Sequence, residues 1–134
     1  MGRILIVDDE EDIRDALHMI FESAGYDVTV ASNGCEAIEL QRAEPADLII
    51  TDIIMPRKDG VATIKEIRQE FPGIRIIATS GGGGVQSEEY VPDAISTTAF
   101  LAAAKEAGAD MVFTKPFERK DLIDAIEDLF ANVH

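Results

Sequence analysis

The sequence is short of cysteine, of basic residues and of long apolar runs. Its single cysteine, Cys35, excludes an intrachain disulfide and a cysteine-based zinc site. No apolar stretch approaches the roughly 20 residues that span a bilayer. The N-terminus turns acidic at Asp8 and lacks the length and cleavage pattern of a signal peptide. We therefore expect a cytoplasmic protein without a membrane segment.

Acidic residues greatly outnumber basic ones. The chain has 26 Asp and Glu against 12 Lys and Arg, a formal net charge of −14. Such a chain repels phosphate backbones, so direct binding of DNA or RNA is not expected. With 134 residues, 46% of them hydrophobic, and only 10 Gly and 5 Pro, it has the composition of a globular protein. The length predicts a single domain over residues 1–134.

Short apolar runs alternate with amphipathic stretches, and the order strand, helix is repeated five times. Near-continuous Ile, Leu and Val in three of the runs indicates parallel strands buried on both faces, whereas the second run alternates and suits an edge. The predicted strands are Arg3–Val7, Tyr26–Ala31, Leu48–Thr51, Ile74–Thr79 and Met111–Thr114.

The stretches between these strands have the period of helices. The first predicted helix stops at Gly25, the second opens at Asn33 with Glu36 as a variant of the capping box, and the third ends before Pro72. After a glycine-rich segment a helix resumes near Ser96 and runs to Gly108, and the last helix covers about Glu118 to Ala131. Strict alternation predicts a doubly wound α/β domain with helices on both faces of a parallel sheet.

Residues that follow the predicted strands carry the chemistry, because ligands of open parallel sheets bind at the carboxyl ends of the strands. Clustered carboxylates without His or Cys favour a hard cation, Mg²⁺ or Mn²⁺, over zinc. Two simpler interpretations stay open, namely that the acids after the first strand cap a helix and that Asp52 is an ordinary cap. The residues in question are Asp8, Asp9, Glu10 and Glu11 after the first strand, Asp52 after the third, Ser80 after the fourth and Lys115 after the fifth.

Beside a divalent cation, Asp52 is a candidate nucleophile, because carboxylates form acyl phosphates. The Ser80 hydroxyl can donate a hydrogen bond to one phosphoryl oxygen, and the Lys115 ammonium can pair with another. A phosphate cofactor at the first strand–helix turn is disfavoured, because Asp8 and Asp9 would repel it.

Together these residues resemble the receiver domain of two-component response regulators over essentially the whole chain. The resemblance implies a flavodoxin-like receiver fold, a five-stranded sheet of order 2-1-3-4-5 flanked by five helices. The segments that carry it are Ile6 to Glu10, Asp47 to Asp52, Met55 to Gly60, Ser80-Gly81 and Lys115-Pro116-Phe117, in this order at strand ends.

The resemblance also implies roles. Asp52 accepts a phosphoryl group from a sensor histidine kinase or a histidine phosphotransfer protein, and a downstream protein target or output domain responds. Mg²⁺ is bound directly by Asp9, Asp52 and the backbone carbonyl of Ile54, and by Asp8 mostly through water. Ser80 and Lys115 contact the phosphoryl group. The chain then catalyses only its own phosphorylation and dephosphorylation and has no external substrate.

Two departures from the family's pattern bear on the switch. Val112 stands where family members usually carry Tyr or Phe, and Ser80 and Lys115 are separated by an insertion over Gly81–Ser96. We expect a modified output surface there. The apolar Ile54 side chain predicts slow self-dephosphorylation, since it would hinder an attacking water.

Two other functions remain as alternatives. A receiver-like module without phosphorylation would act by constitutive protein contact. An Asp-nucleophile phosphatase of the haloacid dehalogenase type would need a second acid, which Asp52-Ile53-Ile54 lacks.

Overall fold

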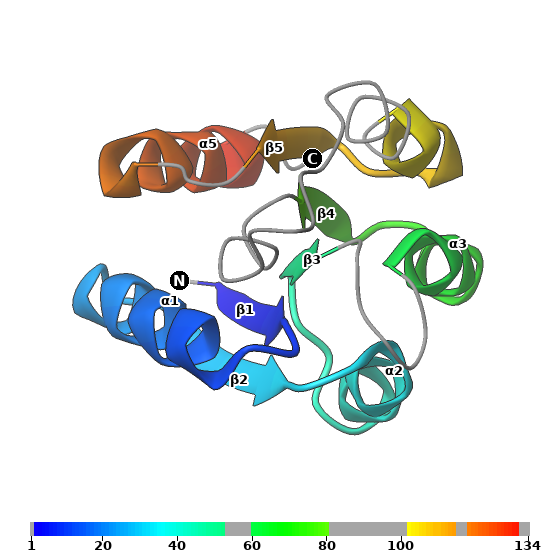
Figure 1. Ribbon diagram of the computed structural model, residues 1–134, viewed down its shortest axis with the longest axis horizontal. Coiled ribbons are helices and arrows are strands. Elements are labelled where there is room, and N and C mark those ends of the chain that lie inside the picture. The colour runs from blue at the N-terminus through cyan, green and yellow to red at the C-terminus, as the bar shows by residue number, and fades with distance from the viewer. Residues whose placement is uncertain (1, 53–59, 81–101, 115–117, 132–134) are drawn as a thin grey trace, which may run out of the picture.

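The structure, a computed structural model, describes residues 2–52, 60–80, 102–114 and 118–131. Residues 102–107 form a further helical segment, which has no label in Figure 1. The labelled elements are β1 (Arg3–Val7), α1 (Glu11–Ser23), β2 (Asp27–Ala31), α2 (Gly34–Ala43), β3 (Leu48–Asp52), α3 (Gly60–Glu70), β4 (Arg75–Ser80), β5 (Met111–Thr114) and α5 (Arg119–Ala131).

The five strands form one parallel sheet in the order β2-β1-β3-β4-β5. Helices cover both faces: α1 and α5 lie on one side, and α2, α3 and the 102–107 segment lie on the other (Figure 1). The predicted doubly wound fold and its strand order are confirmed. Within the described residues, no helix is long and apolar enough to cross a membrane.

Two apolar layers, one on each face, hold the sheet between the helices. Alternate residues of each strand enter opposite layers, as the period of two in a strand requires. In β3, for example, Ile49 packs toward α2 and α3, and Ile50 packs toward α1 and α5. All five residues of β3 are buried, whereas the edge strand β2 is partly exposed. The continuous apolar runs therefore mark the central strands, as predicted.

Strand boundaries differ from the predicted ones by a single residue. Tyr26 precedes β2, Asp52 belongs to β3, and β4 runs from Arg75 to Ser80 instead of starting at Ile74. The β3–β4 ladder explains two of these shifts, because it pairs Leu48 with Arg75 and ends with Asp52 beside Thr79. The predicted insertion Gly81–Ser96 and the start of its helix lie outside the described residues.

The start of α2 shows how a local signal fixes an element boundary. Asn33 is the N-cap and its side chain accepts a hydrogen bond from the Glu36 N–H at 2.9 Å, as the capping pattern predicts. The Glu36 carboxylate reaches one residue further back than in a standard capping box. It accepts the Ser32 N–H at 2.6 Å and the Ser32 hydroxyl at 3.0 Å.

Candidate functional site

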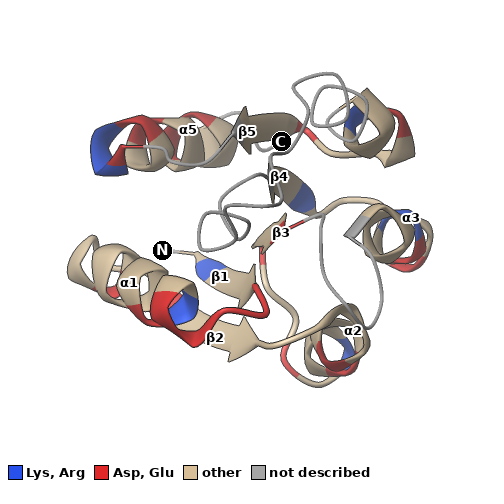
Figure 2. Cartoon of the chain, in the orientation of Figure 1, with Lys and Arg blue, Asp and Glu red and all other residues tan. Residues whose placement is uncertain are grey.

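Three carboxylates from two strands meet at the carboxyl edge of the sheet. Asp8 and Asp9 follow β1, Asp52 ends β3, and each offers an oxygen within 4.8 Å of the others. Asp8 and Asp52 are 2% and 3% exposed, and Asp9 is open to solvent. Figure 2 shows the acidic chain between β1 and α1 on this edge. Among the described residues, no other group of three or more His, Cys, Asp or Glu has this spacing.

Asp8 is fixed by its backbone and by its side chain. Its N–H donates to the Ala31 carbonyl at 3.2 Å, which extends the β1–β2 ladder by one residue. Its Oδ1 accepts the Glu10 N–H at 2.9 Å. The Arg14 guanidinium of α1 donates to the Asp8 carbonyl at 2.8 Å. The turn after β1 is thereby held in one conformation, with the Asp8 carboxylate at the site.

Asp52 is placed by the central strand of the sheet. It pairs in register with Thr79 of β4, and the Thr51 hydroxyl donates to its carbonyl at 3.1 Å. A buried carboxylate is costly without compensating interactions. Asp52 thereby adds a buried carboxylate to the two acids that follow β1. An all-carboxylate donor set fits Mg²⁺ or Mn²⁺, which prefer oxygen ligands.

Helix capping explains only part of this acidity. The N-cap of α1 is Glu10, whose side chain makes no capping hydrogen bond. Glu11 and Asp12 in the first turn suit the helix dipole. The dipole gives no reason for Asp52, on a different element, to lie beside Asp8 and Asp9. The capping interpretation therefore fits the acids of α1 but not the cluster.

The other predicted site residues are described only in part. Ser80 is the last residue of β4, and its Cα partner is Thr114 at the end of β5. The fourth and fifth strands therefore end side by side at the same edge as the acids. Lys115 and Ile54 lie outside the described residues, as do the Met55 to Asp59 positions of the resemblance.

One residue near the site was not predicted. Arg14 supports the turn through the Asp8 carbonyl, and its charge contributes to lowering the pKa of Glu36 at the start of α2, where hydrogen bonds from Ser32 are the larger cause. It is the only Arg or Lys in α1. A lone basic residue on an otherwise acidic helix, one turn after the acids, was the available signal.

Several known proteins resemble this chain in sequence and in structure. The family model for the response regulator receiver domain matches residues 4–127. The chain is 35% identical to the chemotaxis protein CheY of Halobacterium salinarum, and the match covers 95% of each chain. It is 30% identical to sporulation initiation phosphotransferase F of Bacillus subtilis, over 93% of this chain and 90% of that one. A CheY-like receiver domain from Methanospirillum hungatei superposes with a TM-score of 0.80 at 29% identity, covering 96% of this chain and 93% of that one.

Proposed function

The chain belongs to the response regulator receiver domain family, and from this premise we propose that Asp52 accepts a phosphoryl group in a Mg²⁺-dependent reaction. The family is one of signalling domains and not of enzymes that turn over an external substrate. Phosphorylation adds charge at the carboxyl edge of the sheet and thereby changes the surface that partners contact.

One observation carries the proposal: Asp52 is buried at the end of the central strand, within 4.8 Å of two further carboxylates. Three acids so close repel one another unless a cation lies among them. Receiver domains bind Mg²⁺ through acidic residues, and Asp8, Asp9 and Asp52 are the described residues that would hold it here. The backbone carbonyl of Ile54 completes the proposed ligand set.

The residues of the chain then have distinct tasks in the transfer. A carboxylate oxygen of Asp52 forms the new bond to phosphorus while the bond from phosphorus to the donor's histidine nitrogen breaks, and that nitrogen takes the electron pair. A bound Mg²⁺ neutralises negative charge on the phosphoryl group. The Ser80 hydroxyl and the Lys115 ammonium bind its remaining oxygens, so that no oxygen is left without a partner. Water attack on the acyl phosphate reverses the modification.

The donor we propose is a sensor histidine kinase or a histidine phosphotransfer protein in the cytoplasm. The relatives act in different settings, since one is a chemotaxis protein, another a sporulation phosphotransferase and a third the transcriptional regulatory protein PhoP of Bacillus subtilis. The response of this chain is accordingly a change in protein contact, with a downstream target or an output domain. A net charge of −14 disfavours direct contact between this chain and nucleic acid.

Intact mass spectrometry with a small phosphodonor tests the proposal. The protein is incubated with acetyl phosphate, with and without Mg²⁺, beside Asp52→Asn as the matched variant. We expect one phosphoryl adduct that requires Mg²⁺ and is absent from Asp52→Asn. Absence of any adduct from the wild type would refute the proposal and favour the binding-only module. Sustained release of phosphate from unrelated monoesters would favour the phosphatase.

A further inference from the structure

β5 is weakly specified by its neighbours in the chain and in the sheet. It has four residues, Met111–Thr114, and lies at the edge of the sheet against β4 alone. It is joined to β4 by the long stretch of residues 81–110. Near β5 the described part of this stretch is the helical segment 102–107, whose Ala104 is fully buried in the layer with α2 and α3. Loop closure over so long a stretch favours no particular register by itself, because its entropy changes only slowly with length.

The hydrophobic pattern of β5 excludes only some of the wrong registers. Val112 packs in the layer with α2 and α3, and Phe113 packs in the layer with α1 and α5. A slip of one residue exchanges the two faces and is therefore unfavourable. A slip of two residues restores the faces but moves the strand end by about 6.6 Å. Polar contacts at the start of the strand can distinguish the observed register from the one shifted by two residues.

Asp110, the residue before β5, pairs with Ile76 of β4 at two points. Its N–H donates to the Ile76 carbonyl at 2.7 Å, and its Oδ2 accepts the Ile76 N–H at 2.8 Å. The Asp110 carboxylate thus accepts the Ile76 N–H, which in a continued β ladder would donate to a backbone carbonyl of the neighbouring strand. The same arrangement occurs before β3, where the Asp47 N–H donates to the Arg3 carbonyl at 2.9 Å and Asp47 Oδ2 accepts the Arg3 N–H at 2.9 Å.

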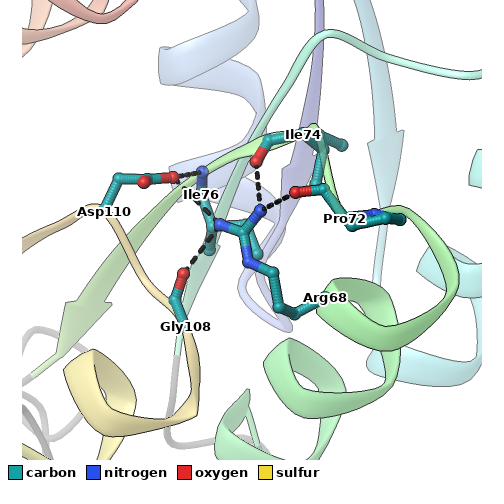
Figure 3. A network of polar contacts seen from close by, with 6 residues as sticks. All are labelled: Arg68, Pro72, Ile74, Ile76, Gly108 and Asp110. Atoms are coloured by element: carbon teal, nitrogen blue, oxygen red, sulfur yellow. Dashed lines mark hydrogen bonds and ion pairs between the residues drawn. The ribbon is translucent and has the colours of Figure 1, made fainter.

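Asp110 differs from Asp47 in being held by a guanidinium (Figure 3). Arg68, in the last turn of α3, donates through Nη2 to Asp110 Oδ2 at 3.1 Å and to the Gly108 carbonyl at 2.7 Å. Through Nη1 it donates to the carbonyls of Pro72 and Ile74, each at 2.7 Å. The Arg68 side chain therefore links the segment that precedes β4 to the segment that precedes β5. The pair is partly shielded, with 25% and 32% of the two side chains exposed.

We propose that Arg68 and Asp110 are positioning residues that set the register of β5 against β4. Their contacts lie at the amino ends of the two strands, and Ser80 lies four residues beyond Ile76, about 13 Å along β4. The register pairs Ser80 with Thr114, after which the chain continues into Lys115. The link to phosphoryl transfer rests on the proposed function, whereas the register claim stands without it.

Amide hydrogen exchange tests the register claim, with Asp110→Ala and Arg68→Gln as variants. The matched control is Arg42→Gln, which removes a two-point ion pair to Glu70 of α3 but touches neither β4 nor β5. We expect β5 amides to exchange about tenfold faster in both variants relative to β1 and β3 amides, because local opening precedes global unfolding. The control should leave the ratio unchanged. Equal acceleration in all five strands would overturn the claim, and Arg68→Gln keeps it testable if Asp110→Ala does not fold.

The phosphorylation rate tests the positioning claim. At a Mg²⁺ concentration that saturates the wild type, we expect Arg68→Gln to accept the phosphoryl group about tenfold more slowly, since a shift of about 1 Å can cost about 100-fold. Its Mg²⁺ affinity should stay unchanged, because Asp8 and Asp9 follow β1 and Asp52 ends β3, away from the Arg68 contacts. Arg68→Lys should recover only part of the phosphorylation rate, since the lysine ammonium lacks the planar set of N–H donors that the guanidinium uses here. An unchanged rate would overturn the positioning role. A wild type that accepts no phosphoryl group would refute the proposed function instead, and hydrogen exchange would still decide the register.

Discussion

At the scale of single residues, hydrogen bonds to the backbone decide where charged side chains lie. The hydrogen bonds from Ser32 hold the pKa of the Glu36 carboxyl below its ordinary value, with the Arg14 charge as a smaller cause. A carboxyl whose pKa is lowered by folding stabilises the folded state above its ordinary pKa. That contribution is lost as the pH falls through the pKa of the folded state.

Glu36→Gln should therefore be less stable than the wild type at neutral pH, and the difference should shrink below the ordinary glutamate value of 4.5. Glutamine keeps an oxygen that can accept the Ser32 N–H, so the variant isolates the charge. Urea unfolding at a series of pH values measures the difference in free energy of unfolding. A difference that does not change with pH would contradict this explanation.

Both the backbone conformation at Gly108 and the close approach of Arg68 require a residue without a side chain there. The φ angle of Gly108 is +130°, a conformation that side chains disfavour, and an added Cβ would lie 3.0 Å from Cγ and Nε of Arg68. We expect Gly108→Ala to lower the free energy of unfolding by about 1–3 kcal/mol. Gly73→Ala is the control, because nothing lies within 4 Å of its added Cβ, and it should change stability by less than about 0.5 kcal/mol. If Gly108→Ala and Gly73→Ala lowered the free energy of unfolding equally, in thermal or urea unfolding, Gly108 would not be required at its position.

At the scale of elements, the sheet separates two cores that should behave independently. Ile64 of α3 and Ile126 of α5 are both fully buried, but they belong to opposite layers. We expect Ile64→Val and Ile126→Val to cost about 0.5–1.5 kcal/mol each. The double variant should show their sum to within about 0.5 kcal/mol, because the sites share no contact. Strong non-additivity in urea unfolding would mean that the sheet couples the two layers.

Elements were predictable from the sequence where one local signal determines them. Apolar runs predict central strands, and Asn33 predicts the start of α2, because each signal acts within a few residues. Strand ends shifted by one residue, since the last pair of a ladder depends on the neighbouring strand, as Asp52 and Thr79 show. The Arg68 contacts were not predictable, because Gly108 and Asp110 lie 40 and 42 residues away in sequence.

The candidate site was predictable for a topological reason. Parallel strands bring their carboxyl ends to one edge, so acids after the first and third strands had to meet, and the close approach of Asp8, Asp9 and Asp52 agrees. Arg14 was missed because its hydrogen bond to the Asp8 carbonyl depends on how α1 returns over the turn. The roles of Ser80, Lys115 and Ile54 remain predictions.

At the scale of the whole molecule, a cation at the acidic edge should stabilise the fold. Binding to the folded state alone adds about 2.7 kcal/mol to the free energy of unfolding at a ligand concentration of 100 times Kd. We expect MgCl₂ to raise Tm beyond the effect of NaCl at equal ionic strength, and Asp9→Asn to lose most of this difference. The salt control is needed because a chain of net charge −14 is stabilised by screening alone. Equal shifts with both salts would contradict the cation site.

Locating the phosphoryl group within the chain tests most directly whether Asp52 is the acceptor. The wild type is phosphorylated with acetyl phosphate in the presence of Mg²⁺, digested under conditions that preserve acyl phosphates, and analysed by peptide mass spectrometry. We expect one modified position, Asp52, with Asp8 and Asp9 unmodified although their oxygens lie within 4.8 Å of those of Asp52. A phosphoryl group on any other residue, or on none, would contradict this expectation.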